Sequence, residues 1–140
     1  MDTRRAINAY VQTGVETGVP EADPHTLILM LFDGALAAVA NARLKLMAGD
    51  IPGRGLAISK AIGIIEQGLL PSLDLEKGGQ LAERMAALYE YITTRLLEAN
   101  LHANQASLEE VERLLSELQS AWRAIGAPQT GDNARNAMPA

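Results

Sequence analysis

The sequence contains no cysteine, and only 4% of its 140 residues are aromatic. Without cysteine the chain can form no disulfide framework, no thiolate nucleophile and no cysteine-based metal site. With one tryptophan, one phenylalanine and three tyrosines, a core must be built mainly from aliphatic side chains. Apolar residues still make up 48% of the chain, which predicts one folded domain rather than a disordered protein.

Basic residues are also scarce, with 12 Lys and Arg against 17 Asp and Glu and a net charge of −5. Apart from Arg4-Arg5 there is no basic cluster, so we expect neither a nucleic-acid surface nor attraction to an anionic membrane. Asp33-Gly34 interrupts the longest apolar runs, and the first residues lack the apolar centre of a signal peptide. The sequence therefore predicts a cytoplasmic protein without membrane insertion.

Four segments carry apolar residues at helical spacing: 23–48, 50–70, 80–104 and 107–125. Asp23-Pro24 and Asp50-Ile51-Pro52 are typical helix starts, Ser107 with Glu110 forms a capping box, and Pro71 should end or bend the second helix. We predict an all-α, antiparallel up-down-up-down four-helix bundle over residues 23–127. Residues 1–22 are expected to form a flexible, loosely attached N-terminal segment, and residues 128–140 a disordered tail. The broad apolar surface of 80–104 predicts that this helix is the centre of the bundle.

Residues that could perform chemistry are few. His25 and His102 are more typical of surface positions than of catalysts. Glu98 and His102 form a single pair spaced by four residues, whereas a ferritin-like metal site needs several inward ligands. A histidine-phosphotransfer bundle using His102 remains an alternative. We predict no enzyme, no catalytic residue, no metal and no cofactor.

The first three helices have more apolar surface than a four-helix bundle needs. In the second helix a row of small residues with Ile64 among them predicts a shallow trough, next to apolar positions of the third helix. The candidate groove residues are Ala57, Ala61, Ile64, Gly68, Tyr89 and Leu97. Such a surface is typical of a groove for an apolar partner helix, but it would also suit a homodimer seam in a helical adaptor.

The N-terminal segment has its own apolar pattern. Ile7, Val11 and Val15 are spaced by four residues with Tyr10 beside them, so a helix here would present a narrow apolar ridge. A mobile tail and a docking segment are both compatible with this pattern.

Several motifs follow one another in a characteristic order. They are INAY, PHTLILMLFDGAL, SKAIGIIEQGLLPSLDLEKGG, LYEYITTRLLEAN and LEEVERLLSELQSAW. Together, from about Ile7 to Ile125, they closely resemble the flagellar secretion chaperone FliS family. The series is more specific than any one motif, because each alone could occur in an unrelated bundle.

The resemblance implies a small helical bundle of the bacterial cytoplasm, without enzymatic activity or cofactor. It implies binding of the disordered C-terminal segment of flagellin, prevention of its premature polymerisation, and delivery to the flagellar type III secretion apparatus. Ile7 and Tyr10 match the Ile-x-x-Tyr element that the family links to the export gate protein. With the apolar ridge, this makes Ile7, Tyr10, Val11 and Val15 candidates for a lid on the groove, a gate contact, or both in turn. From the surplus apolar surface we also expect that the client-free protein can form a homodimer.

Overall fold

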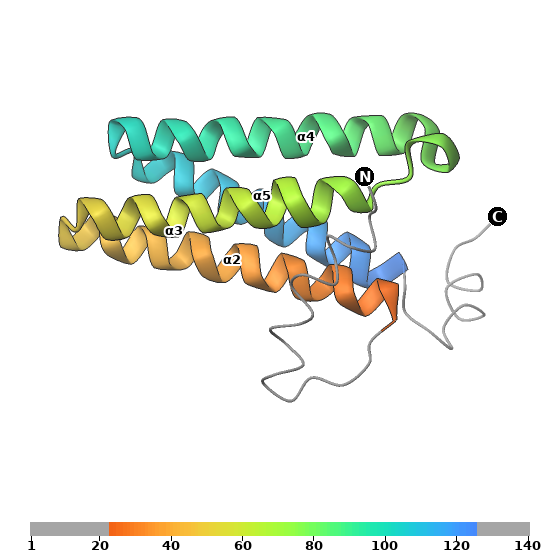
Figure 1. The fold of residues 1–140 in the computed structure, drawn as a ribbon, viewed down its shortest axis with the longest axis horizontal. Coiled ribbons are helices and arrows are strands. Elements are labelled where there is room, and N and C mark those ends of the chain that lie inside the picture. The colour runs from red at the N-terminus through yellow and green to blue at the C-terminus, as the bar shows by residue number, and fades with distance from the viewer. Residues whose placement is uncertain (1–22, 126–140) are drawn as a thin grey trace.

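The computed structural model describes residues 23–125, which form an antiparallel bundle of four α-helices. These are α2 (Pro24–Ala48), α3 (Ile51–Ile64), α4 (Leu75–His102) and α5 (Gln105–Ile125). Successive helices alternate in direction (Figure 1), so the predicted fold class is confirmed. The predictions for residues 1–22 and 126–140 lie outside the described residues.

Helix starts follow the capping signals in the sequence. Asp23 accepts a hydrogen bond from the Thr26 amide at 2.8 Å, and Asp50 accepts one from Gly53 at 2.9 Å. A carboxylate at this position satisfies an amide that has no partner within the helix. At its other end α2 stops at Gly49, whose φ of 73° is left-handed and suits glycine. The predicted limits of the first helix are therefore confirmed.

The start of α5 differs from the prediction. The helix begins at Gln105, and the Asn104 side chain accepts the hydrogen bond from the Ser107 amide at 3.3 Å. Ser107 is fully buried inside the first turn, so the predicted capping box at Ser107 is wrong. The cause is the short connection, since α4 ends with Ala103 in the left-handed conformation and leaves Asn104 to begin the next helix.

The connection from α3 to α4 is more helical than expected. A π-helical turn, η1 (Ile65–Leu69), and a 3₁₀ turn, η2 (Leu70–Ser72), continue α3 to the proline at position 71. Residues 75–79, which precede the predicted 80–104 helix, already form the first turns of α4, which Asp74 caps. Gly79 then kinks the helix with a φ of 56°. The short loop places the start of α4 beside the end of α5 (Figure 1).

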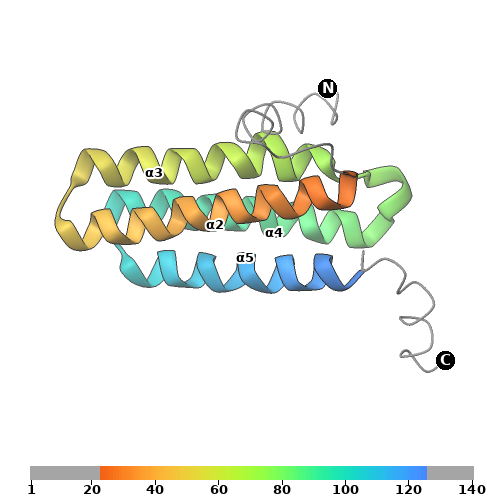
Figure 2. The same cartoon turned by 90° about the horizontal axis from the view of Figure 1, so that it is seen from below.

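The core is aliphatic, as the composition predicts, but its centre is α2 rather than the 80–104 helix. In Figure 2, α2 lies between α3 and α5, and it packs most closely with these two. By contrast, Leu81 and Leu97 of α4 are 65% and 59% exposed, so the central position predicted for this helix is wrong. The buried residues of α2 are Ile28, Leu31, Phe32, Ala35, Ala38, Val39 and Ala42.

Within the described range, α2 has the length and composition of a membrane span, with 25 residues and a mean hydropathy of 1.6 over its most apolar window. A core helix of a soluble bundle has the same composition. The apolar stripe of α2 packs against α3 and α5, and 39% of its most apolar window is buried.

Candidate functional site

The row of small residues predicted to line a trough lies in the core instead. Ala57, Ala61, Ile64 and Gly68 are all buried. A β-carbon added at Gly34 of α2 would meet Ile64 Cδ1 at 3.3 Å, so this row faces α2. Its small side chains let two helices approach closely and leave no groove, and the prediction of an open trough is wrong in its geometry.

The two groove residues predicted in α4, Tyr89 and Leu97, differ in burial. Tyr89 is 2% exposed, and its burial raises the pKa of the phenol well above the usual value, which keeps it neutral. Leu97 lies on the surface with Leu101 of α4, while Leu56 is exposed on α3. We call Leu97 and Leu101, which flank Asn100 on α4, the α3–α4 face.

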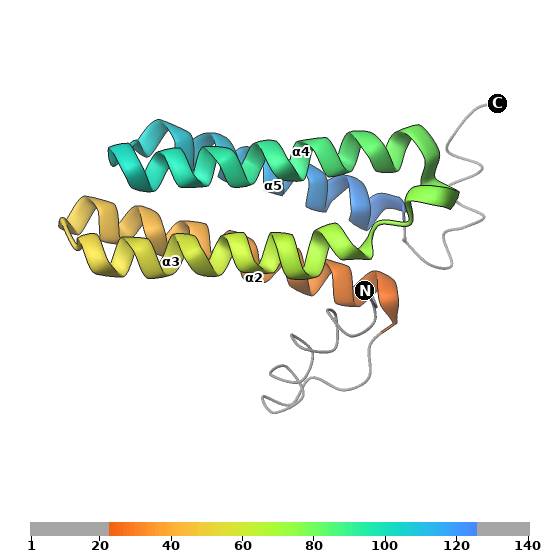
Figure 3. The same ribbon diagram turned by 45° about the horizontal axis from the view of Figure 1, so that its top comes forward.

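The α3–α4 face lies at the end of the bundle that holds the α2–α3 and α4–α5 turns (Figure 3). Arg54 ties the two helices together there, donating from Nε to Asn100 Oδ1 at 3.1 Å and from a terminal nitrogen to the Asn100 carbonyl at 2.9 Å. Over their whole length α3 and α4 pack less closely than the other neighbouring helices. Leu97 and Leu101 thus lie on α4 beside this looser contact.

A hollow apolar surface occurs at the opposite end of the bundle, between the start of α4 and the end of α5. It encloses about 360 Å³, and its lining is almost entirely apolar. We call it the end groove, and its large apolar residues are Leu73, Leu81, Met85, Leu118, Trp122 and Ile125. Helical periodicity selects these side chains as apolar-face positions, which in a closed bundle would lie in the core. Sequence alone could not show that α4 and α5 leave this space between them.

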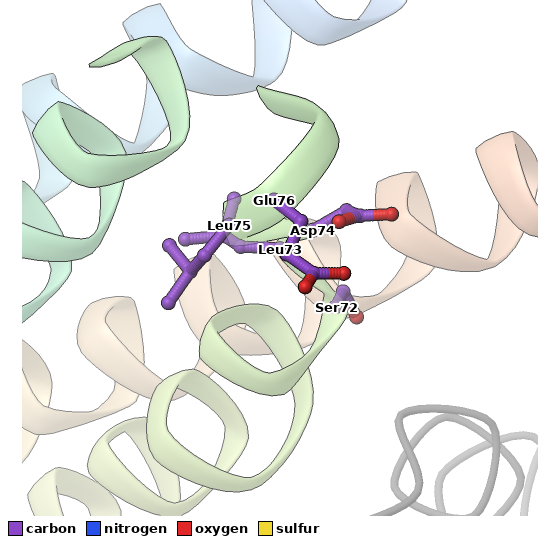
Figure 4. Close-up of a pocket in the computed structure, with 5 residues that line it drawn as sticks. All are labelled: Ser72, Leu73, Asp74, Leu75 and Glu76. Carbon is purple, nitrogen blue, oxygen red and sulfur yellow. The ribbon is translucent and has the colours of Figure 1, made fainter. Parts of the chain in front are cut away.

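A more polar hollow of about 460 Å³ adjoins the end groove at the η2–α4 turn. Ser72, Leu73 and Asp74 line both hollows, and Leu75 and Glu76 complete this one. Figure 4 shows the carboxylates of Asp74 and Glu76 on the same side of the turn. Neither forms a salt bridge within residues 23–125, so the end groove has an acidic rim on this side.

The described residues offer few groups for chemistry. In the range 23–125 no three His, Cys, Asp or Glu side chains come together as metal ligands. Glu98, half of the pair considered as a metal ligand set, forms a salt bridge with Arg95 at 2.6 Å. His102 is exposed in the last turn of α4. The arrangement is therefore suited to binding another chain through apolar contacts.

The sequence profile of the family described as flagellar protein FliS matches residues 6–129. The chain belongs to the FliS family. The flagellar secretion chaperone FliS of Salmonella typhimurium (strain LT2) is 50% identical over 125 residues, covering 89% of this chain and 93% of the relative. FliSB of Pseudomonas aeruginosa is 43% identical over 125 residues, covering 89% and 98%. FliS of Escherichia coli (strain K12) is 42% identical over 123 residues, covering 88% and 90%.

Membership of the FliS family confirms the resemblance seen in the sequence motifs and places the chain among flagellar secretion chaperones. The matched range spans the whole described bundle, including both apolar surfaces.

Proposed function

We propose that this protein binds the disordered C-terminal segment of flagellin in the bacterial cytoplasm, prevents its premature polymerisation and delivers it to the flagellar type III secretion apparatus. The observation that carries the proposal is the open, apolar end groove in a member of the flagellar chaperone family. A flagellin segment that will later bury an apolar helix face in the filament must have that face covered beforehand.

The shape and chemistry of the end groove suit an amphipathic helix. Leu81 and Ile125 project on its two sides, while Trp122 and Leu118 form part of its wall. A partner helix would present apolar residues at positions i, i+3 and i+4 to such a groove. Because a disordered client loses conformational entropy on binding, its affinity stays lower than the contact area suggests, which favours later release.

The α3–α4 face is a second contact for the same client. Leu81 and Leu97 lie 16 positions apart on α4, which corresponds to about 24 Å along the helix. A long disordered segment can span this distance and engage both surfaces. Leu97, the exposed member of the predicted groove, belongs to this second contact.

The N-terminal segment is proposed to serve the delivery step. Ile7 and Tyr10 would contact the export gate protein, and the same residues with Val11 and Val15 would cover apolar surface when no client is present. The segment joins α2 at Asp23, at the end of the bundle that holds the end groove (Figure 1). Replacing Val11 and Val15 together by Asp should speed client association, measured by stopped-flow mixing. An unchanged association rate would contradict the lid.

The test of client binding compares two leucines of equal exposure. Leu81→Glu places a charge at the end groove, whereas Leu44→Glu places one on α2, outside both proposed contacts; the side chains are 65% and 64% exposed. Calorimetric titration with a flagellin C-terminal peptide should show affinity at least tenfold weaker for Leu81→Glu and unchanged for Leu44→Glu. Equal affinity of both variants would place the client elsewhere, and no binding by the wild type would refute the proposed function.

Self-association of the client-free protein stays a prediction, and the same pair of variants tests it. If the wild type is a dimer and Leu81→Glu is a monomer in analytical ultracentrifugation, the end groove is also the dimer seam. If in addition the flagellin peptide binds both forms equally, the homodimeric adaptor becomes the better interpretation of the groove.

A further inference from the structure

One wall of the end groove is held by an unusual pair of residues. The rings of His25 and Trp122 stack with their centroids 5.1 Å apart and their planes at 14°. Trp122 donates from Nε1 to the His25 carbonyl at 3.1 Å. In return His25 Nε2 lies 2.7 Å from the Trp122 carbonyl, and because a carbonyl only accepts, this nitrogen donates. Each ring is thus bound to the backbone of the other residue.

The pair connects two places that matter for the proposed function. Trp122 lines the end groove, and it is the single tryptophan of the chain. His25 is the second residue of α2, two positions after Asp23, where residues 1–22 join the bundle. The indole of Trp122 is held by its hydrogen bond to the His25 carbonyl. A movement of the first turn of α2 would move this carbonyl and therefore the indole.

We propose that His25 is a positioning residue, which holds Trp122 in the client-binding arrangement and makes that arrangement depend on the first turn of α2. This inference rests on the proposed function, since it concerns the affinity of the same groove for the same client. A displacement of the first turn of α2 would then change the groove by moving His25, which is bound to Trp122. A site responds in this way only when its two arrangements differ in affinity for the client.

Within residues 23–125, polar side chains also link α2 and α5 at Gln119 and at Arg43. Gln119 donates to Asp33 at 2.6 Å, and Arg43 forms a salt bridge with Glu112. Arg43 lies 18 positions beyond His25, about 27 Å farther along α2 and away from the end groove. Arg43→Ala therefore removes a link between the same two helices without touching the groove, and it provides the matched control.

The experiment compares wild type, His25→Ala, His25→Gln and Arg43→Ala as full-length chains. Two readouts are taken: affinity for a flagellin C-terminal peptide, and the emission of Trp122, which reports its exposure to water. Denaturant midpoints are measured alongside to record any general loss of stability. Glutamine retains an N–H donor at about the reach of Nε2 but cannot stack, so it separates the hydrogen bond from the ring contact.

We expect His25→Ala to shift the emission to longer wavelength and to weaken peptide binding about tenfold, with His25→Gln intermediate in both. Arg43→Ala should lower the denaturant midpoint and leave emission and affinity unchanged. The proposal is overturned if His25→Ala leaves the affinity unchanged, or if both alanine variants weaken binding in proportion to their loss of stability. If the wild type does not bind the peptide, the proposed function fails, while the emission still shows whether His25 holds Trp122.

Discussion

Two helices of similar length, α2 with 25 residues and α4 with 28, use their apolar side chains in opposite ways. The exposed large apolar residues of α2, Leu44 and Met47, lie only near its end, whereas α4 leaves leucines in the solvent near both of its ends. Small residues such as Ala35 and Ala61 let α2 and α3 approach closely. α4 packs less closely against its neighbours than α2 packs against α3, both at the α3–α4 face and at the end groove. Apolar content alone therefore does not determine burial, which depends on how closely the neighbouring helix can approach.

The sharpest test of this contrast uses neighbouring leucines of α4. Leu96 is fully buried and Leu97 is 59% exposed. Leu96→Ala removes core contacts and leaves a cavity, which typically costs about 2–5 kcal/mol. Leu97→Ala should change the free energy of unfolding by no more than about 0.5 kcal/mol. Urea unfolding followed by circular dichroism measures both, and equal losses would show that the seam beside Leu97 is closed.

The second prediction concerns the row of small residues in α3. Ala61 is fully buried against the core, so Ala61→Leu should overpack the contact and destabilise the protein by about 1–3 kcal/mol. In an open trough the same substitution would be neutral or would strengthen apolar binding. Thermal unfolding of the variant distinguishes these cases, with Ser59→Leu on the exposed side of α3 as the control. An unchanged melting temperature for Ala61→Leu would support the prediction of an open trough at this row.

The sequence predicted the helices and their order because periodicity and capping are local properties. Asp23, Asp50 and Gly49 act within one or two turns of the chain, and each has the role that its type and position indicate. The end groove depends on the space left between Leu81 and Ile125, which are far apart in the sequence. Periodicity selects both of these residues as apolar-face positions, yet it cannot decide whether a third helix covers them. For the same reason it mistook the close α2–α3 contact at Ala57 and Ala61 for a trough.

A smaller effect is expected where α4 begins, next to the end groove. Asp74 accepts a hydrogen bond from the Lys77 amide at 3.0 Å and caps the helix. Asp74→Ala should cost about 1 kcal/mol of unfolding free energy, and Asp74→Asn should retain most of it, because asparagine is an equally good cap. Chemical denaturation measures the two losses. A loss of equal size in both variants would mean that the charge, rather than the cap, matters at this turn.

The smallest expected effect lies in the seam between α4 and α5, away from the end groove. Tyr91 donates its hydroxyl proton to Glu110 at 2.6 Å, and Arg95 donates from Nε to the same carboxylate at 2.7 Å. These two hydrogen bonds, that of Tyr91 first, lower the pKa of Glu110 below its ordinary value of 4.5. Glu98 and Arg113 also lie near this group of side chains.

Because the folded state lowers the pKa of Glu110, its contribution to stability is fully present above the unfolded value and is lost as the pH falls through the folded value. Glu110→Gln should therefore be less stable than wild type near neutral pH, and the difference should shrink on acidification, when the protonated wild-type side chain comes to resemble glutamine. Denaturant midpoints of the two proteins across the acidic range measure this difference in stability. Because the other carboxylates titrate alike in both proteins, their effect cancels when the two are compared. A difference that stays constant with pH would show that ionisation of Glu110 does not stabilise the contact between α4 and α5.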